Sequence, residues 1–215
     1  GGVIGVFFFG WAVLCEKFAV GNVCYALIGA AIPLMISGGF HVDGYMDTMD
    51  AFHSYQSREK KLEILKDSHI GAFAAIMLAL YYMIDIAAIS EIHTQKAVSA
   101  LAAVFFLARC FSGIAVMTLQ PAKKEGLLYT FASSAQKVRV KAALYFQAAL
   151  CVAIMLLVSG WYGAAAIGAA LLSFFYFKKK SYKELGGITG DTAGFFVTVC
   201  EAAAAAAVAM AGYFL

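Results

Sequence analysis

The feature that most limits what this chain can fold into is a series of long apolar blocks. Seven blocks can be marked along the 215 residues, at about 2–15, 22–40, 70–90, 97–119, 141–159, 161–177 and 193–215. Most approach the roughly 20 residues that a helix needs to cross about 30 Å of hydrocarbon. Only 13% of the residues are charged, compared with about 25% in a soluble domain. Because the blocks lack the alternation of a membrane barrel, the sequence predicts an all-α, polytopic membrane protein with about seven spans.

Residues 1–215 are predicted to form one domain. The chain has only two prolines, and no stretch has the composition of a disordered linker. Its five cysteines are scattered without a CxxC pair, which is typical of small buried hydrophobic residues. A net charge of +3 is too small to indicate a nucleic-acid partner. Since Gly1 opens directly into an apolar block without a basic leader, we expect some N-terminal residues of the intact protein to be missing.

Basic residues gather on alternate connections between the blocks. The long connections at 41–69, 120–140 and 178–192, with Lys141 at the edge of the second, hold thirteen of the sixteen lysines and arginines, whereas the opposite connections hold only Lys17 and Lys96. Cytoplasmic loops of membrane proteins are enriched in Lys and Arg. We therefore expect the three long connections to face the cytoplasm from a cytoplasmic (inner) membrane. An alternating distribution of this kind is what seven spans predict.

The strongest local pattern is an acidic run directly after the second block. Asp43, Asp47 and Asp50 have i, i+4 and i+7 spacing, which would place them on one face of a helix. Their mutual repulsion would be offset by Mg²⁺, which proteins hold with carboxylates and substrate phosphates. A solvated acidic helix end is the alternative, and it is less favourable beside an apolar span. We predict the three aspartates as catalytic metal ligands, with the adjacent His41 as a substrate contact.

The same connection continues with a charged segment at 58–68. Leu62 and Leu65 would form a narrow apolar stripe among acids and lysines, as in an amphipathic helix at a membrane surface. The sequence thus predicts an acidic and amphipathic cytoplasmic loop over 41–69. Within its later part, Asp67 is the candidate for a catalytic role.

A glycine-rich cluster, GGITGD at 186–191, precedes the last block. Glycines let backbone N–H groups approach a ligand closely, and a following helix N-terminus favours anions. Gly187, Thr189 and Gly190 are therefore candidate phosphate contacts. Asp191 is a candidate catalytic acid, or alternatively an ordinary helix N-cap.

Two charged residues lie within predicted spans. Arg109 needs a partner there, either a substrate diphosphate or a site acid, unless its side chain reaches the lipid headgroups. Glu201 either bonds a neighbouring helix or contributes to the site. We predict both as substrate contacts, with these alternatives open.

Three ordered motifs carry a resemblance to a known family. The motifs are GGFHVDGYMDTMDAF at 38–52, LEILKDSHIGAF at 62–73 and GGITGDTAG at 186–194. Together they resemble cobalamin synthase, the adenosylcobinamide-GDP ribazoletransferase family, and the resemblance runs along the whole chain. It implies an inner-membrane enzyme that uses Mg²⁺. It also implies that the enzyme joins adenosylcobinamide-GDP to α-ribazole or its 5′-phosphate, releasing GMP.

Residue by residue, the resemblance places the family's acidic pattern on the three aspartates of the run and its glycine pattern on 186–191. Arg109 and Glu201 match family residues within later spans. Lys123 stands where the family usually has an arginine, and we predict it as a substrate contact. His69 also replaces a usual arginine, which is a departure from the second motif.

Two other functions remain open at this point. Another Mg²⁺-dependent membrane transferase acting on a diphosphate would use the same acidic run, but the Asp-Gly-x-x-Ala-Arg pattern of CDP-alcohol phosphatidyltransferases is absent. A transporter would couple ions through acids inside its spans, whereas here the acids gather at span ends. The partners we expect are the two small-molecule substrates and the lipid bilayer, with no nucleic acid. Association with further copies of the chain is left open.

Overall fold

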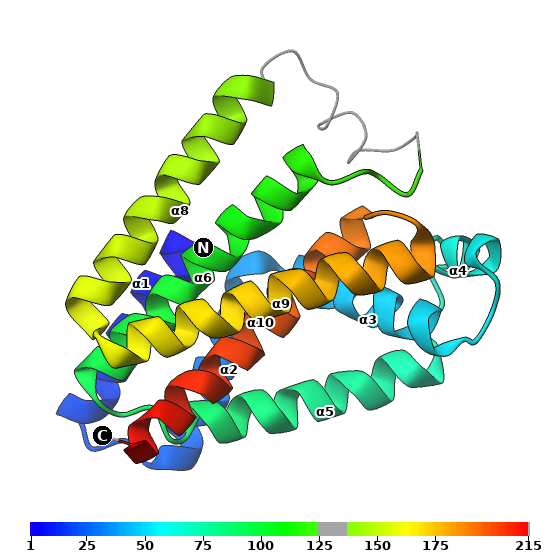
Figure 1. The fold of residues 1–215 in the computed structure, drawn as a ribbon. Coiled ribbons are helices and arrows are strands. Elements are labelled where there is room, and N and C mark those ends of the chain that lie inside the picture. Colours follow the sequence, from blue (N-terminus) through cyan, green and yellow to red (C-terminus); the bar gives the residue numbers. More distant parts are fainter. Residues whose placement is uncertain (124–136, 215) are drawn as a thin grey trace.

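The computed structural model describes residues 1–123 and 137–214. Within these ranges the chain forms nine α-helices and one short 3-10 helix, η1 (Gly212–Phe214), and no β-strand. The α-helices are α1 (Gly2–Lys17), α2 (Asn22–Ser37), α3 (Phe40–His53), α4 (Arg58–Ile64), α5 (Ala72–Ile89), α6 (Gln95–Thr118), α8 (Lys137–Ser159), α9 (Trp161–Leu185) and α10 (Gly190–Ala211). The predicted all-α class is confirmed (Figure 1).

Seven of these helices correspond to the seven apolar blocks, but they are not equally suited to span a membrane. Of the helices in the described ranges, α5, α6, α8 and α10 have the required length and composition, and the bent pair α2–α3 can count as a fifth span. Helices α1 and α2 have 16 residues each, about 24 Å at 1.5 Å per residue. That length is short of about 30 Å of hydrocarbon. The multi-pass membrane class is therefore supported, and the predicted count of seven spans is not confirmed.

Helix α10 is the central element of the bundle and packs against α3, α5, α6 and α9. Its middle is the alanine run 202–207, and Ala204, Ala205 and Val208 are completely buried. Small side chains let neighbouring backbones approach closely, which is how helices pack in membranes without a hydrophobic driving force. The alanine run thus allows four helices to surround one.

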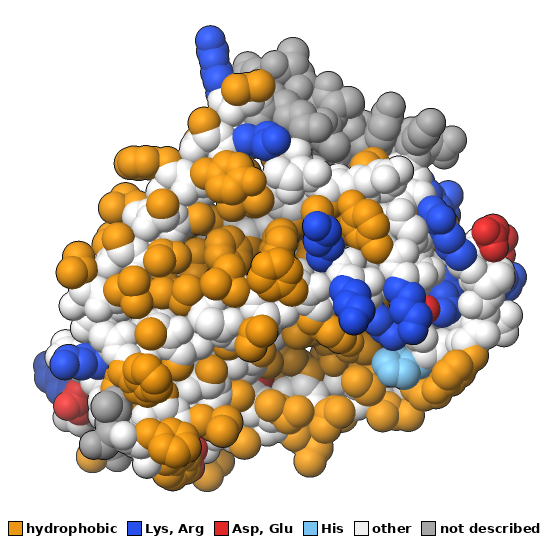
Figure 2. Space-filling model, in the orientation of Figure 1, with side chains coloured by type: hydrophobic (Ala, Val, Ile, Leu, Met, Phe, Trp, Pro, Cys, Tyr) orange, Lys and Arg blue, Asp and Glu red, His pale blue; other side chains and the backbone are white. Residues whose placement is uncertain are grey.

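Large hydrophobic side chains cover the outside of the bundle. Figure 2 shows them over the outer face of α8 and α9, whereas Lys and Arg side chains gather toward the end where α4 lies. Leu157 of α8 is 85% exposed and Leu172 of α9 is 73% exposed. A soluble monomer rarely exposes a continuous apolar surface of this extent. Lipid is the environment that suits this surface.

The three long charged connections meet at one end of the bundle. Lys123 donates from Nζ to the Leu62 carbonyl at 2.9 Å, which joins the first two connections. Ile188 donates to the Gln120 carbonyl at 3.0 Å, and Ala122 donates to the Ile188 carbonyl at 2.8 Å, which joins the second and third. The three long connections therefore lie together, as the distribution of basic residues predicted, and the side of the membrane that they face stays a prediction. Part of the second connection, 124–136, lies outside the described residues.

Two predicted boundaries are wrong. Helix α9 continues through the lysine-rich segment to Leu185, so the third connection comprises only 186–189 rather than 178–192. The second block was expected to continue to residue 40, but α2 ends at Ser37. Gly38 and Gly39 both take positive φ angles, 65° and 82°, which glycine adopts without steric cost. The chain bends there by 96° into α3.

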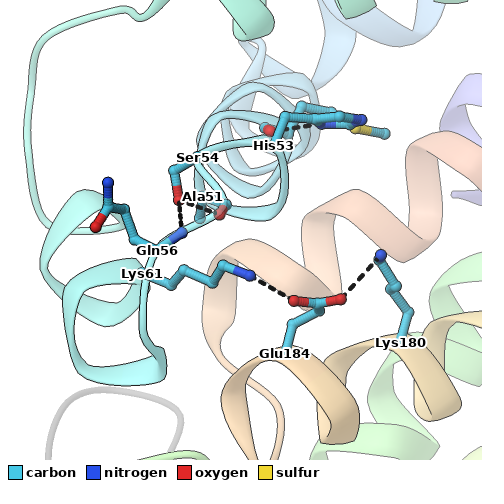
Figure 3. A network of polar contacts seen from close by, with 8 residues as sticks. Ala51, His53, Ser54, Gln56, Lys61, Lys180 and Glu184 are labelled. Carbon is cyan, nitrogen blue, oxygen red and sulfur yellow. Dashed lines mark hydrogen bonds and ion pairs between the residues drawn. The ribbon is translucent and has the colours of Figure 1, made fainter.

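Helix α4 is the amphipathic element predicted within 58–68, and an ion pair holds it against α9. Lys61 is buried, and its Nζ donates to Oε2 of Glu184 at 2.5 Å. Lys180, one turn earlier on α9, pairs with Oε1 of the same carboxylate at 3.0 Å. Figure 3 shows both lysines pointing at Glu184 from opposite sides. Helix α4 is therefore part of the packed end of the bundle rather than only a membrane-surface element.

Neighbouring lysines on α4 offer a test of this contact. We expect Lys61→Met to lower the free energy of unfolding by about 2 kcal/mol, because the Glu184 carboxylate, which is only 13% exposed, loses one of its two cations. Lys60→Met should leave stability unchanged, since Lys60 is 59% exposed and pairs with an exposed glutamate. Thermal unfolding of both variants in detergent measures the difference. Equal melting temperatures would show that the Lys61 pair does not hold α4.

Candidate active site at the crossing of α3 and α10

Two glycines bring the backbones of α3 and α10 into direct contact. A Cβ atom on Gly44 of α3 would lie 2.8 Å from the carbonyl oxygen of Asp191. A Cβ atom on Gly194 of α10 would lie 3.1 Å from the carbonyl oxygen of His41. No side chain fits at Gly44 without separating the helices, and one at Gly194 would crowd the α3 backbone. The two glycines thus fix how the acidic helix lies on the N-terminal end of α10.

This crossing gathers acids from two distant segments. Asp43 and Asp47 flank Gly44 on α3, and Asp191 lies directly beneath Gly44 on α10. The negative charges of these three groups act on one another. In the described part of the chain, no group donates a hydrogen bond to the carboxylates of Asp43 and Asp47. Carboxylates that repel one another and have no protein donors favour a bound cation.

Thr189, not Asp191, caps the N-terminus of α10. The Thr189 hydroxyl accepts a hydrogen bond from the Thr192 N–H at 3.1 Å, and the Thr192 hydroxyl accepts one from the Thr189 N–H at 2.8 Å. This reciprocal pair is a capping box. The alternative interpretation of Asp191 as the N-cap is therefore wrong. Asp191 lies in the first turn, where its side chain accepts a 3.4 Å hydrogen bond from the Thr189 hydroxyl.

The glycines of the 186–191 cluster have different surroundings. A Cβ atom on Gly187 would lie 2.6 Å from the Gln120 carbonyl oxygen, so this glycine allows the close pairing of 120–122 with Ile188. Gly190 has open space beside it, with no atom within 4 Å of an added Cβ. The N-terminus of α10 is thus accessible at Gly190, where a phosphate contact was predicted, and is occupied by protein at Gly187.

Arg58 is a cation beside this cluster that the sequence did not single out. A Cβ atom on Gly186 would lie 2.1 Å from the Arg58 Cζ and Nη1 atoms, so the guanidinium lies directly on this glycine. Arg58 is exposed and forms no ion pair or hydrogen bond with another described residue. From the sequence, Arg58 was predicted only as one of the charged residues of an amphipathic helix. Its proximity to Gly186 depends on the docking of α4, which no short-range pattern reveals.

Asp50 takes a different position from the other two acids of the run. Its Oδ2 accepts a hydrogen bond from the Gly71 N–H at 2.7 Å and its Oδ1 one from the Ala74 N–H at 2.9 Å. These donors belong to the N-terminus of α5, which has no side-chain cap of its own. Asp50 therefore caps α5 from another helix and carries charge of the favourable sign for the helix dipole. Its predicted role as a metal ligand stays a prediction.

Replacement of Asp50 separates these two roles. We expect Asp50→Ala to lower the free energy of unfolding by about 1–2 kcal/mol, as for loss of a helix cap. Asp50→Asn should lose less, because the amide oxygen still accepts one N–H. Denaturation in detergent, with and without Mg²⁺, measures both. If Asp50→Ala kept wild-type stability and lost only metal binding, Asp50 would be a ligand rather than a cap.

Arg109 and Glu201 pair with each other inside the bundle. The Arg109 Nη1 atom bonds the Glu201 Oε1 atom, and it also donates to the Phe105 carbonyl at 2.7 Å. The pair joins α6 to α10, and the Glu201 carboxylate is buried. Among the alternatives left open by the sequence, Arg109 pairs with an acid on a neighbouring helix, and Glu201 bonds a neighbouring helix through this cation. Their predicted contact with substrate is not tested by this geometry.

Asp85 of α5 is a buried acid that the sequence analysis passed over. It is 5% exposed, and its charge acts on Glu201. The signal was present, since an aspartate inside an apolar block of a membrane protein is rare and usually functional. Asp85 is therefore a further acid of interest inside the bundle, on the helix next to α10.

Asp67 and His41 lie in contrasting surroundings. Asp67 is exposed and bonds His69, with 2.6 Å from Oδ1 to the ring Nδ1 and 3.1 Å to the backbone N–H. These hydrogen bonds lower the pKa of Asp67, and the carboxylate raises the pKa of His69. His41 of α3 is half-buried, and its ring Nδ1 has no hydrogen-bond partner among the described residues. A catalytic role for Asp67 and a substrate contact for His41 both stay predictions.

The acids fit Mg²⁺ that arrives with a phosphate ligand. Among the described residues, no group of three or more His, Cys, Asp and Glu side chains is arranged to hold a metal ion. Mg²⁺ usually keeps several waters and takes one or two protein carboxylates together with substrate phosphates. Asp43 and Asp47 provide such oxygen donors beside an accessible helix N-terminus. The donor set therefore suits a substrate-bridged Mg²⁺ rather than a closed protein cage.

The fold and the site define a class: a polytopic helical membrane protein with an acidic site at its charged end. A family model described as cobalamin-5-phosphate synthase matches residues 1–209. The chain belongs to this family, and the resemblance carried by the three motifs is confirmed. No solved structure matches the chain.

Three relatives named adenosylcobinamide-GDP ribazoletransferase illustrate the similarity. The protein of Lachnoclostridium phytofermentans is 41% identical over 211 residues, which cover 98% of this chain and 80% of the relative. That of Azorhizobium caulinodans is 30% identical over 201 residues, covering 90% and 75%. That of Escherichia coli K12 is 29% identical over 178 residues, covering 82% and 71%. The match thus extends over most of each protein.

Proposed function

We propose that the protein is an adenosylcobinamide-GDP ribazoletransferase that joins adenosylcobinamide-GDP to α-ribazole, or its 5′-phosphate, and releases GMP. The observation that carries the proposal is the gathering of Asp43, Asp47 and Asp191 where α3 crosses α10. This acidic site lies at the charged end of a bundle that belongs to the cobalamin-5-phosphate synthase family. Family membership supports these substrates, and the geometry supports the crossing of α3 and α10 as the place where the diphosphate would react.

In this reaction a ribazole hydroxyl attacks the phosphorus that stays with cobinamide, and GMP leaves. Such transfers depend on positioning and on stabilising the charge of the phosphoryl group. Arg58 on Gly186 and Lys123 beside α4 supply cations near the glycine cluster. The open N-terminus of α10 at Gly190 offers backbone N–H groups of the right polarity for a phosphate. These groups bind and orient the diphosphate.

Asp43 and Asp47 would hold Mg²⁺ against the diphosphate, where the ion would neutralise charge on the phosphate oxygens. Asp191 lies next to both acids and outside the helix cap, so we assign to it the orientation and deprotonation of the attacking hydroxyl. Asp67 is the less suitable base, because its carboxylate already bonds His69.

The proposed location is the inner membrane, with the site facing the cytoplasm. The supporting observation is that the basic connections meet at the end of the bundle that carries the acids. Cytoplasmic connections are enriched in Lys and Arg, and nucleotide substrates are available on that side.

An assay of membranes that contain the protein tests this function. Supplied with Mg²⁺, adenosylcobinamide-GDP and α-ribazole, they should release GMP and form a cobalamin. We expect Asp47→Asn to reduce turnover by roughly 100-fold or more, because a group that stabilises the phosphoryl charge is lost. Chromatography of the nucleotide and corrinoid products measures both.

The control is Glu63→Gln, which removes an exposed acid of α4 at the same end of the bundle and should leave turnover near wild type. Near-normal activity of folded Asp47→Asn would refute the proposed role of the acids. Failure of the wild-type protein to release GMP would refute the function itself.

A further inference from the structure

We propose that the cavity at the α2–α3 bend binds the aromatic base of the acceptor nucleoside, ribazole. This inference rests on the proposed function and deepens it, because it separates the site of the acceptor from that of the nucleotide-activated corrinoid. The cavity has a volume of about 460 Å³ and lies between α2, α3 and α5.

The bend itself creates this cavity. Gly38 and Gly39 turn the chain by 96°, so the end of α2 and the start of α3 diverge in front of α5. The walls that matter here are Leu34, Gly39, Asp43, Met46, Leu78 and Tyr82. They are apolar apart from one carboxylate and one phenol. A cavity with mainly apolar walls and a few polar groups is typical of a site for a small organic ligand.

The position of the cavity connects it to the acidic site. Asp43 belongs to both, since it lines the cavity and flanks Gly44 at the crossing of α3 with α10. A ligand in the cavity therefore lies within one side chain of the place where the diphosphate reacts. This is the position that an acceptor hydroxyl must reach.

Size and charge distinguish between the two substrates. A nucleoside with a two-ring base fits a cavity of ≈ 460 Å³, within the range of roughly 300–1,000 Å³ for small-molecule sites. The corrin ring system of the other substrate is several times larger than such a base. The diphosphate of the GDP end is assigned to the acidic site with Mg²⁺, and its guanine carries several hydrogen-bond donors and acceptors that a mainly apolar lining would leave unpaired. The aromatic base of ribazole, which has fewer polar groups than guanine, is the part of the two substrates that suits this lining.

The orientation of the acceptor follows from the lining. The flat base packs between the α3 side chain Met46 and the α5 side chains Leu78 and Tyr82. The ribose then lies toward Asp43 and the acidic site, with its hydroxyl available for attack. Burial of the base away from water stabilises this arrangement by the hydrophobic effect.

Two leucines of α5 provide a matched test. Leu78 lines the cavity, whereas Leu80 is 45% exposed on the outer side of the same helix. We expect Leu78→Trp to fill the cavity and raise the KM for α-ribazole by about tenfold or more, the equivalent of about 1.4 kcal/mol. The KM for adenosylcobinamide-GDP should change less than about twofold. Leu80→Trp should leave both values at wild type.

Binding of α-ribazole to purified protein in detergent, measured by equilibrium dialysis, gives a readout independent of turnover. If Leu78→Trp does not fold, Leu78→Phe offers a smaller filling of the same space, with the same expected direction. An active wild type whose filled variants keep the KM for α-ribazole would overturn the inference and leave the function intact. Equal rises in both KM values would also overturn it. A wild type that neither binds nor converts α-ribazole would instead refute the proposed function.

Discussion

The crossing of α3 over the N-terminus of α10 is the contact on which the site depends. Because Gly44 and Gly194 have no side chains, the two backbones touch, and Asp43 and Asp47 come to lie beside Asp191. Any side chain at Gly44 would clash with the Asp191 backbone and push α3 away from α10. The acids would then belong to separate helices rather than to one site.

Two ion pairs hold charged groups elsewhere in the bundle, in contrast with the acids of the site. Arg109 bonds Glu201 between spans, and Lys61 bonds Glu184 at the charged end. Taking a charge out of water costs several kcal/mol unless a partner compensates. Asp43 is exposed and Asp47 is partly buried, and neither forms an ion pair or hydrogen bond with another described side chain. The repulsion between these neighbouring carboxylates is best offset by a cation that arrives with a ligand.

The sequence predicted the helices and the acidic run, because apolar block length and i, i+4 spacing are local properties. It also predicted that the charged connections share one end. It did not predict that Asp50 caps α5, or that Arg58 rests on Gly186, since these contacts join segments 21 and 128 residues apart. The count of seven spans was not confirmed, because block counting does not distinguish a short 16-residue helix from a full span.

The bend at Gly38–Gly39 explains how the acidic helix α3 comes to pack against the spans of a membrane protein. A straight helix over residues 22–53 would be about 48 Å long, and its acidic end would project past the hydrocarbon into water. The 96° bend instead turns α3 back across α5 and α10. There Asp50 stabilises the start of α5, while Asp43 faces the cavity that the bend opens. A single pair of glycines thus places the acids against the spans and provides a neighbouring space for an apolar substrate.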